Sequence, residues 1–346
     1  MLVDQKSPHG GDVYTHEKVL DFSSNVNPAG MPPPVRRALA AAIDRCAQYP
    51  DPYCRKLRQK AAAAAGVGEE QLLFGNGASE LIYSFAYALS REKPALVVAP
   101  AFCEYAAALQ AAGCDTEYYV TGPGSGFALD EGFLETDLSG CSAVFLCSPS
   151  NPAGALTDPP IVLGLLKTGA RVLLDVSFLE LTEQPHCYPL AEWVEAYPGL
   201  VVLRAFTKSY AMAGVRLGCA MCSDEAFLRR MSRAAQCWNV SVLAQEAGAA
   251  ALDCGGWLAA SAEQLHAEKR RFLQGLGRLN VTVFPSAANY ILLYSPADVY
   301  EPLLKKGILV RDCSDYIGLG KGYYRIAVRT APENDRLLAA LSEILA

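Results

Sequence analysis

The chain has 346 residues, of which 51% are hydrophobic and 19% charged, and its formal net charge is −6. This composition indicates a globular protein with a sizeable core, long enough for two domains, and excludes a disordered chain. The negative net charge argues against a nucleic-acid partner. No apolar run reaches the roughly 18 residues that cross a bilayer, and the first residues lack the apolar core of a signal peptide. We therefore expect a cytoplasmic protein.

The polar arm at residues 1–34 is rich in Gly and Pro and contains His9-Gly10-Gly11. An irregular start of this length is either disordered or laid across a functional surface. Helical patterning follows over residues 35–47 and again over 53–65, where Gly66 ends the second helix.

Strands and helices alternate from residue 72 onward. Continuous Val and Leu runs predict strands that are covered on both faces, at residues 95–99, 115–120, 142–147, 171–175, 200–204 and 217–221. This alternation predicts an α/β fold with a mainly parallel sheet.

The pattern changes after about residue 224. A long helical region is followed by short strands at 281–284, 290–294, 308–311 and 323–328, and by a terminal helix from residue 333. We therefore expect an N-terminal arm over residues 1–34, a large domain over 35–230 and a smaller α+β domain over 231–346.

The twelve cysteines are scattered singly, many of them in apolar or Ala-rich segments. A buried free cysteine behaves as a small hydrophobe. The one close pair, Cys219 and Cys222, has no second pair and no histidine nearby. We expect reduced, mostly structural cysteines and no metal site.

Lys208 follows the strand at 200–204, in a polar turn between Thr207 and Ser209. Burial or a nearby cation lowers the pKa of a lysine held in a pocket, and the neutral amine can then attack an aldehyde. Thr207 and Arg216 could hold a phosphate close by, the arginine as a planar fork of donors. A solvated lysine is the alternative for this motif alone.

Other polar and aromatic residues also follow strand ends, where ligands bind in open α/β sheets. The run Gly75–Glu80 opens a helix after a strand and forms an anion site or a plain glycine turn. Phe102 could cover a planar ring or belong to the core, and Asn151 could bond a phenolic oxygen or only form an Asn-Pro turn. Asp175 needs a partner such as a protonated pyridine nitrogen, or is an N-cap.

Together these motifs describe a pocket for a planar phosphorylated pyridine. The chain resembles the fold-type I pyridoxal-phosphate enzymes of the class I/II aminotransferase superfamily, from the Asn-Pro segment near residue 27 to the C-terminal helix. The resemblance implies pyridoxal 5'-phosphate as the cofactor and a homodimer with shared active sites. A non-catalytic pyridoxal-phosphate sensor is the other class of protein, but such proteins carry an added domain and this fold uses the whole chain.

The resemblance also implies roles for individual residues. Lys208 would bind the cofactor aldehyde and Asp175 would pair with the pyridine nitrogen. The remaining cofactor-binding residues would be Gly77, Ala78, Ser79, Thr207 and Arg216 at the phosphate, Tyr49 at the same phosphate from the other subunit, Asn151 at the ring hydroxyl and Phe102 on the ring. Phe178 departs from the pattern, because aminotransferases have a tyrosine there that shares the ring hydroxyl with Asn151.

Two groups within the superfamily are similar to this chain. His9-Gly10-Gly11, Phe178 and the run Arg325–Thr330 resemble the threonine-phosphate decarboxylases of cobalamin biosynthesis, which convert L-threonine O-3-phosphate to (R)-1-amino-2-propanol O-phosphate. The histidinol-phosphate aminotransferases are the alternative. On the decarboxylase reading, Arg325 would bind the substrate carboxylate. The other substrate-binding residues would be Ser7, His9 and Arg311 at the substrate phosphate, together with Asn27.

Overall fold

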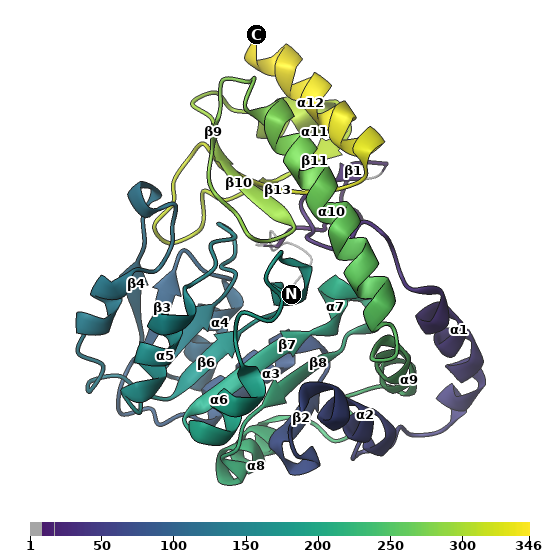
Figure 1. Cartoon of the computed structure of the whole chain (residues 1–346), viewed down its shortest axis with the longest axis vertical. Coiled ribbons are helices and arrows are strands. Elements are labelled where there is room, and N and C mark those ends of the chain that lie inside the picture. Colours follow the sequence, from purple (N-terminus) through teal and green to yellow (C-terminus); the bar gives the residue numbers. More distant parts are fainter. Residues whose placement is uncertain (1–8, 17) are drawn as a thin grey trace.

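The computed structural model describes residues 9–16 and 18–346, and its largest sheet has seven strands (Figure 1). The strand order is β2-β8-β7-β6-β5-β3-β4, and β8 runs antiparallel to both of its neighbours while the other pairs are parallel. The strands are β2 (Leu72–Gly75), β3 (Ala95–Ala99), β4 (Thr116–Val120), β5 (Ala143–Cys147), β6 (Val172–Asp175), β7 (Leu200–Ala205) and β8 (Gly218–Met221). The predicted α/β fold with a mainly parallel sheet is confirmed.

Helices cover both faces of this sheet, because neighbouring residues along each strand point to opposite sides. Val97, Phe145 and Leu173 pack on one face, and Leu96, Val144 and Leu174 on the other. The first face carries α3 (Gly77–Ala88), α4 (Glu104–Ala112) and α8 (Glu225–Ala234). The second face carries α2 (Arg55–Ala65), α5 (Pro159–Lys167), α6 (Leu190–Ala196) and α9 (Val242–Ala251), with α1 (Pro33–Ala42) packed on α9.

A smaller antiparallel sheet lies above the large one in Figure 1, in the order β12-β13-β10-β9. Its strands are β9 (Thr282–Val283), β10 (Tyr290–Tyr294), β12 (Arg311–Asp312) and β13 (Tyr323–Ala327). The long helix α10 (Gly255–Leu276) runs from α9 toward α12 (Ala331–Leu345), and α11 (Tyr300–Lys305) lies beside β11 (Ile308–Leu309). The predicted boundary at residue 230 falls inside α8, and the exact division of the chain stays a prediction.

The N-terminal arm is attached to the smaller sheet's side of the molecule. Its strand β1 (Leu20–Asp21) pairs in parallel with β11 (Ile308–Leu309). The backbone N–H of Ala327 donates to the carbonyl of Phe22 at 2.8 Å, and the Phe22 side chain is fully buried in the core of this part of the molecule. The described part of the arm is therefore laid across a surface, in line with one of the two arrangements that its composition predicts.

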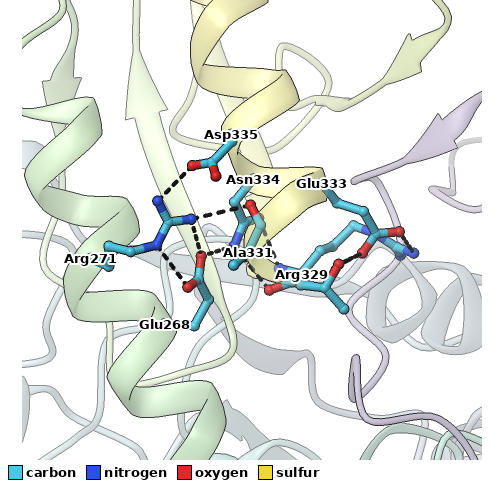
Figure 2. Close-up of polar contacts among 8 residues, drawn as sticks. Glu268, Arg271, Arg329, Ala331, Glu333, Asn334 and Asp335 are labelled. Carbon is cyan, nitrogen blue, oxygen red and sulfur yellow. Dashed lines mark hydrogen bonds and ion pairs between the residues drawn. The ribbon is translucent and has the colours of Figure 1, made fainter.

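A polar cluster fixes the end of β13 to α10 and α12 (Figure 2). Asn334 donates to Glu268 at 2.8 Å and to the Arg329 carbonyl at 2.9 Å, while Arg271 contacts both Glu268 and Asp335. Arg329 pairs with Glu333 and also donates to the carbonyl of Asp21 in the arm. The end of the strand that carries Arg325 is thus bonded directly to α12 and to the arm, and α10 is bonded to the same part of α12.

The remaining differences from the predicted elements are local. The strand predicted at 308–311 is two short strands, β11 and β12, which belong to different sheets. The helix predicted over 35–47 ends as a 3-10 turn. The 3-10 turns are Ile43–Ala47, Glu69–Gln71, Pro123–Ser125, Glu131–Glu135, Leu179–Leu181 and Ala213–Val215. Each of the twelve cysteines is free, and the described part of the chain contains no helix with the length and apolarity to span a membrane.

Candidate active site

A cavity of about 460 Å³ lies at the carboxyl ends of the parallel strands, and the residues that follow β3, β5, β6 and β7 converge on it. The cavity brings together nine of the predicted site residues in addition to His9. They are Ala78, Ser79, Phe102, Asn151, Asp175, Thr207, Lys208, Arg216 and Arg325. Carboxyl ends of parallel strands share one edge of the sheet, which is why residues so far apart in sequence meet here.

One end of the cavity is built to hold an anion. Helix α3 begins at Gly77, so the first backbone N–H groups of the helix have no intrahelical partner and point outward with the helix dipole behind them. Gly77 has a φ of +78°, and a Cβ there would lie 2.4 Å from Nη2 of Arg216. A Cβ on Gly218 would lie 2.5 Å from the backbone nitrogen of Ala78. Gly77 lets the Arg216 guanidinium approach the helix start, and Gly218 lets β8 approach it, which leaves a cradle for a phosphate.

Lys208 sits in the short helix α7 (Phe206–Ser209), directly after β7. Burial, together with the nearby positive charges of Arg325 and Arg216, lowers the pKa of its amine to about 8. Near neutral pH a larger share of the amine is therefore neutral than in a solvated lysine, and the neutral amine is the form that attacks an aldehyde.

Asp175 ends β6 and is 6% exposed. Its Oδ2 accepts a hydrogen bond from the Tyr105 hydroxyl at 2.7 Å, and its Oδ1 accepts from the Ser177 backbone N–H at 2.9 Å. Burial raises the pKa of the carboxyl, while these two donors act in the opposite direction. A buried carboxylate aimed into a cavity favours a cationic partner such as a protonated ring nitrogen.

Arg325 lies opposite, on β13, and is 5% exposed. It donates to the side-chain oxygen of Asn151 and, at 2.6 Å, to the Ser23 carbonyl of the arm. Its Nε has no hydrogen-bond partner among the described residues. Because Asn151 accepts from Arg325 through its oxygen, its amide N–H₂ remains for an oxygen acceptor in the cavity.

Phe102 and His9 form the wall toward the arm. The Phe102 ring meets the Tyr105 ring edge-on at 6.0 Å and the His9 ring at 5.7 Å. His9 Nε2 lies 2.8 Å from Glu104 Oε1, and its Nδ1 lies 3.7 Å from Cys103 Sγ. The arm is thus held against the start of α4 beside the ring-covering phenylalanine.

Apart from Gly77, which begins α3 beside the cavity, three described residues of the predicted site do not line it. Arg311 lines a neighbouring cavity of about 180 Å³ that shares Phe102 and Tyr316 with the first, and its Nη2 is paired with Asp315 at 2.7 Å. Asn27 is buried, its backbone N–H donates to the Lys208 carbonyl at 3.0 Å, and its side chain donates to the Ser209 carbonyl.

Tyr49, the third, is 79% exposed and stacks on Trp238 with ring centroids 4.4 Å apart. Ser7 falls outside the described residues. The roles assigned to the site residues, both those that line the cavity and these four, stay predictions.

Several residues of the site were not anticipated. Tyr105 lies in an Ala-rich helix and has the pattern of a core residue, and Phe102 lies two residues before that helix begins. Ser177 contributes through its backbone, which no side-chain motif reveals. Ser23, Asn25 and Tyr316 line the cavity from segments far from the strand ends.

The donor set fits one cofactor well. The cradle suits a phosphate, Lys208 an aldehyde, Asp175 a protonated ring nitrogen and Phe102 the face of a planar ring. These positions, on a mainly parallel sheet with a smaller antiparallel one beside it, define a fold-type I pyridoxal-phosphate-dependent enzyme.

Comparison with known proteins specifies the family. A family model described as aminotransferase class I and II matches residues 17–341, and the chain belongs to this family. It is 36% identical to the threonine-phosphate decarboxylase of Salmonella typhimurium, over 98% of this chain and 97% of that protein. It is 33% identical to the histidinol-phosphate aminotransferase of Geobacillus thermodenitrificans, over 96% and 92%.

The solved structures agree with this assignment. The crystal structure of the histidinol-phosphate aminotransferase from Clostridium acetobutylicum superposes with a TM-score of 0.88 at 25% identity, over 94% of this chain and 99% of that one. The protein is thus a pyridoxal 5'-phosphate enzyme whose relatives include both decarboxylases and aminotransferases.

Proposed function

We propose that the enzyme decarboxylates L-threonine O-3-phosphate to (R)-1-amino-2-propanol O-phosphate, the reaction that supplies the aminopropanol unit in cobalamin biosynthesis. The observation that carries this proposal is the position of His9. The arm returns over the cavity and places His9 and Gly10 in its lining, beside Phe102. His9 would donate to a substrate phosphate in exchange for one of its present partners, Glu104 or Cys103.

The two glycines after His9 explain how the arm reaches this position. A Cβ on Gly10 would lie 2.2 Å from the Ser23 carbonyl oxygen, and Gly11 has a φ of +85°. The Gly11 N–H donates to Ser23 Oγ at 2.7 Å, which ties this turn to the segment that also receives Arg325. Side chains at either glycine would push the arm away from the cavity. The His-Gly-Gly motif therefore has a steric reason as well as a chemical one.

The chain's own residues support loss of the carboxyl group in a definite way. When bound, the cofactor supplies an electron-accepting ring for the electrons left at Cα. Arg325 would hold the substrate carboxylate, and Asp175 would keep the proton on the ring nitrogen. Lys208, with its pKa lowered to about 8, would carry the proton that Cα receives after CO₂ leaves. The carbon–carboxyl bond breaks, and one C–H bond replaces it.

Phe178 is consistent with this proposal. It lies under the cavity, 6% exposed, with its ring 6.0 Å from the Lys208 amine and edge-on to Tyr290. A phenylalanine cannot donate to the ring hydroxyl oxygen, so Asn151 would be the donor there. The aminotransferase pattern has a tyrosine at this position, and the difference favours a distinct reaction.

The alternative is amino transfer from histidinol phosphate, which is favoured by the close superposition on the Clostridium aminotransferase. One pair of assays separates the two functions: release of CO₂ from threonine phosphate, and 2-oxoglutarate-dependent turnover of histidinol phosphate. We expect the first to proceed and the second to be at least a hundredfold slower in kcat/KM. The opposite order would refute the proposed function while leaving the family assignment intact.

We also propose that the enzyme is a homodimer. Tyr49 and Trp238 form an exposed stacked pair, and Tyr53 is 60% exposed on the same loop. Large aromatic side chains clustered on a surface are enriched at protein interfaces. Tyr49 would then reach the cofactor phosphate of the other subunit.

A further inference from the structure

Tyr105 is held rigidly against Asp175. It lies on the first turn of α4, is 1% exposed, and packs against Phe145 with ring centroids 5.6 Å apart as well as edge-on to Phe102. Its hydroxyl lies 2.7 Å from Oδ2 of Asp175. The packing of the ring leaves the hydroxyl little freedom to point elsewhere.

The two oxygens of Asp175 are each anchored by one donor. Tyr105 bonds Oδ2 and the Ser177 backbone bonds Oδ1, so the plane of the carboxyl group is fixed. A carboxylate oxygen can accept more than one hydrogen bond, so both oxygens keep capacity for a ligand in the cavity. Tyr105 and the Ser177 backbone thus orient Asp175, which is the group that would itself contact the ligand.

The electrostatic effect of the tyrosine has a definite sign. Burial raises the pKa of Asp175, and the hydrogen bonds from Ser177 and Tyr105 lower it. Burial and the nearby Asp175 raise the pKa of the Tyr105 hydroxyl well above its usual value, so the phenol keeps its proton and remains a donor. Without the hydroxyl, Asp175 would hold a proton more tightly and compete with the ring nitrogen for it.

We propose that Tyr105 is a positioning residue that keeps Asp175 ionised and aimed at the ring nitrogen of the cofactor. This inference rests on the proposed role of Asp175, but it does not depend on which substrate the enzyme uses. The start of α4 and the residues just before it would then act on the ring twice. Phe102, two residues before the helix, would cover the ring, and Tyr105, on the first turn, would act on its nitrogen.

The test is Tyr105→Phe, studied as holoenzyme without substrate and reconstituted with cofactor labelled with nitrogen-15 at the ring nitrogen. The labelled resonance reports whether that nitrogen carries a proton. In the wild type we expect a protonated nitrogen, and in the variant a shift toward the unprotonated position, with the cofactor dissociation constant raised about tenfold, as for one hydrogen bond to a charged group. Tyr316→Phe is the matched control, since Tyr316 lines the same cavity and no described bond joins it to Asp175. Its nitrogen resonance should match the wild type.

The outcomes separate the two ideas. An unprotonated ring nitrogen in the wild type would overturn the role of Asp175 itself. A protonated nitrogen in both proteins would overturn only the role of Tyr105, even if the variant binds cofactor less tightly, because packing alone would explain that loss. If Tyr105→Phe lowers the melting temperature severely, the same substitution in an Asp175→Ala background decides the question through cofactor affinity. A tenfold effect that persists there would refute action through Asp175.

Discussion

The pair formed by Arg311 and Asp315 offers the sharpest test of substrate recognition. Nη2 of Arg311 lies 2.7 Å and 2.9 Å from the two carboxylate oxygens of Asp315, and the side chains are 11% and 46% exposed. A substrate phosphate that bound Arg311 would compete with this carboxylate for the same nitrogen. Asp315→Asn should therefore strengthen binding of phosphate, and Arg311→Ala should weaken it.

The two magnitudes follow from the exposure of the pair. An ion pair with a half-exposed partner is worth about 0.5–1 kcal/mol, so its removal should improve phosphate binding about two- to fivefold. Loss of the arginine removes charge-assisted bonds of roughly 1.5–3 kcal/mol and should cost at least tenfold. The measurements are the inhibition constant of inorganic phosphate and the KM for threonine phosphate in CO₂ release.

The control is Glu301→Gln, which removes an acidic charge from α11, where no described contact joins Glu301 to Arg311. It should leave both constants within a factor of about two. If Asp315→Asn and Arg311→Ala weaken phosphate binding by similar factors, the pair is a structural support for the loop after β12. The assignment of Arg311 to the substrate phosphate would then be wrong.

Three further predictions concern Lys208 and the phosphate cradle. The rate at which the apoenzyme binds pyridoxal phosphate, followed by absorbance, should rise with pH and level off above about 8, because the Lys208 amine must be neutral; a profile still rising steeply at pH 10 would contradict the lowered pKa. The pKa of Lys208 is lower in the folded state than its unfolded value of about 10.4, so protonation of the amine destabilises the fold increasingly as the pH falls from 10.4 toward 8. Lys208→Met should therefore raise the melting temperature of the apoenzyme at pH 7 and have less effect at pH 10. Gly77→Ala should raise the cofactor dissociation constant at least tenfold, since its Cβ would meet Arg216 at a φ of +78°, whereas Gly214→Ala, with nothing within 4 Å, should leave it nearly unchanged.

The strand ends were the part of the site that sequence could reveal. Lys208, Asp175 and Asn151 each follow an apolar run, and the rule that parallel strands end at one edge predicts their convergence without any knowledge of side-chain packing. The same rule says nothing about Tyr105, because the residue lies inside an Ala-rich helical segment where a buried tyrosine usually serves the core. Only the packing of α4 on the sheet brings its hydroxyl to Asp175.

The sequence also does not predict the long-range contacts of the arm. Asn27 belongs to the segment that carries the family resemblance. It does not line the cavity, and instead donates hydrogen bonds to the carbonyls of Lys208 and Ser209. The pairing of Arg311 with Asp315 depends on a loop whose course no periodic pattern predicts. A sequence shows which residues can take part in such bonds, but the choice between a ligand and an internal partner is made by the geometry of the fold.

The attachment of the arm also constrains the order in which the protein can be assembled. The Ser23 carbonyl receives its bond from Arg325, 302 residues later in the chain, and β1 pairs with β11. During synthesis from the N-terminus, the arm must therefore wait until nearly the whole chain has left the ribosome. The large sheet, whose strands lie between residues 72 and 221, can form during that interval. We expect a nascent chain stalled before β11 to contain a folded sheet while β1 and Ser23 are undocked and protease-sensitive, so that protection of this part of the arm marks a late step of folding.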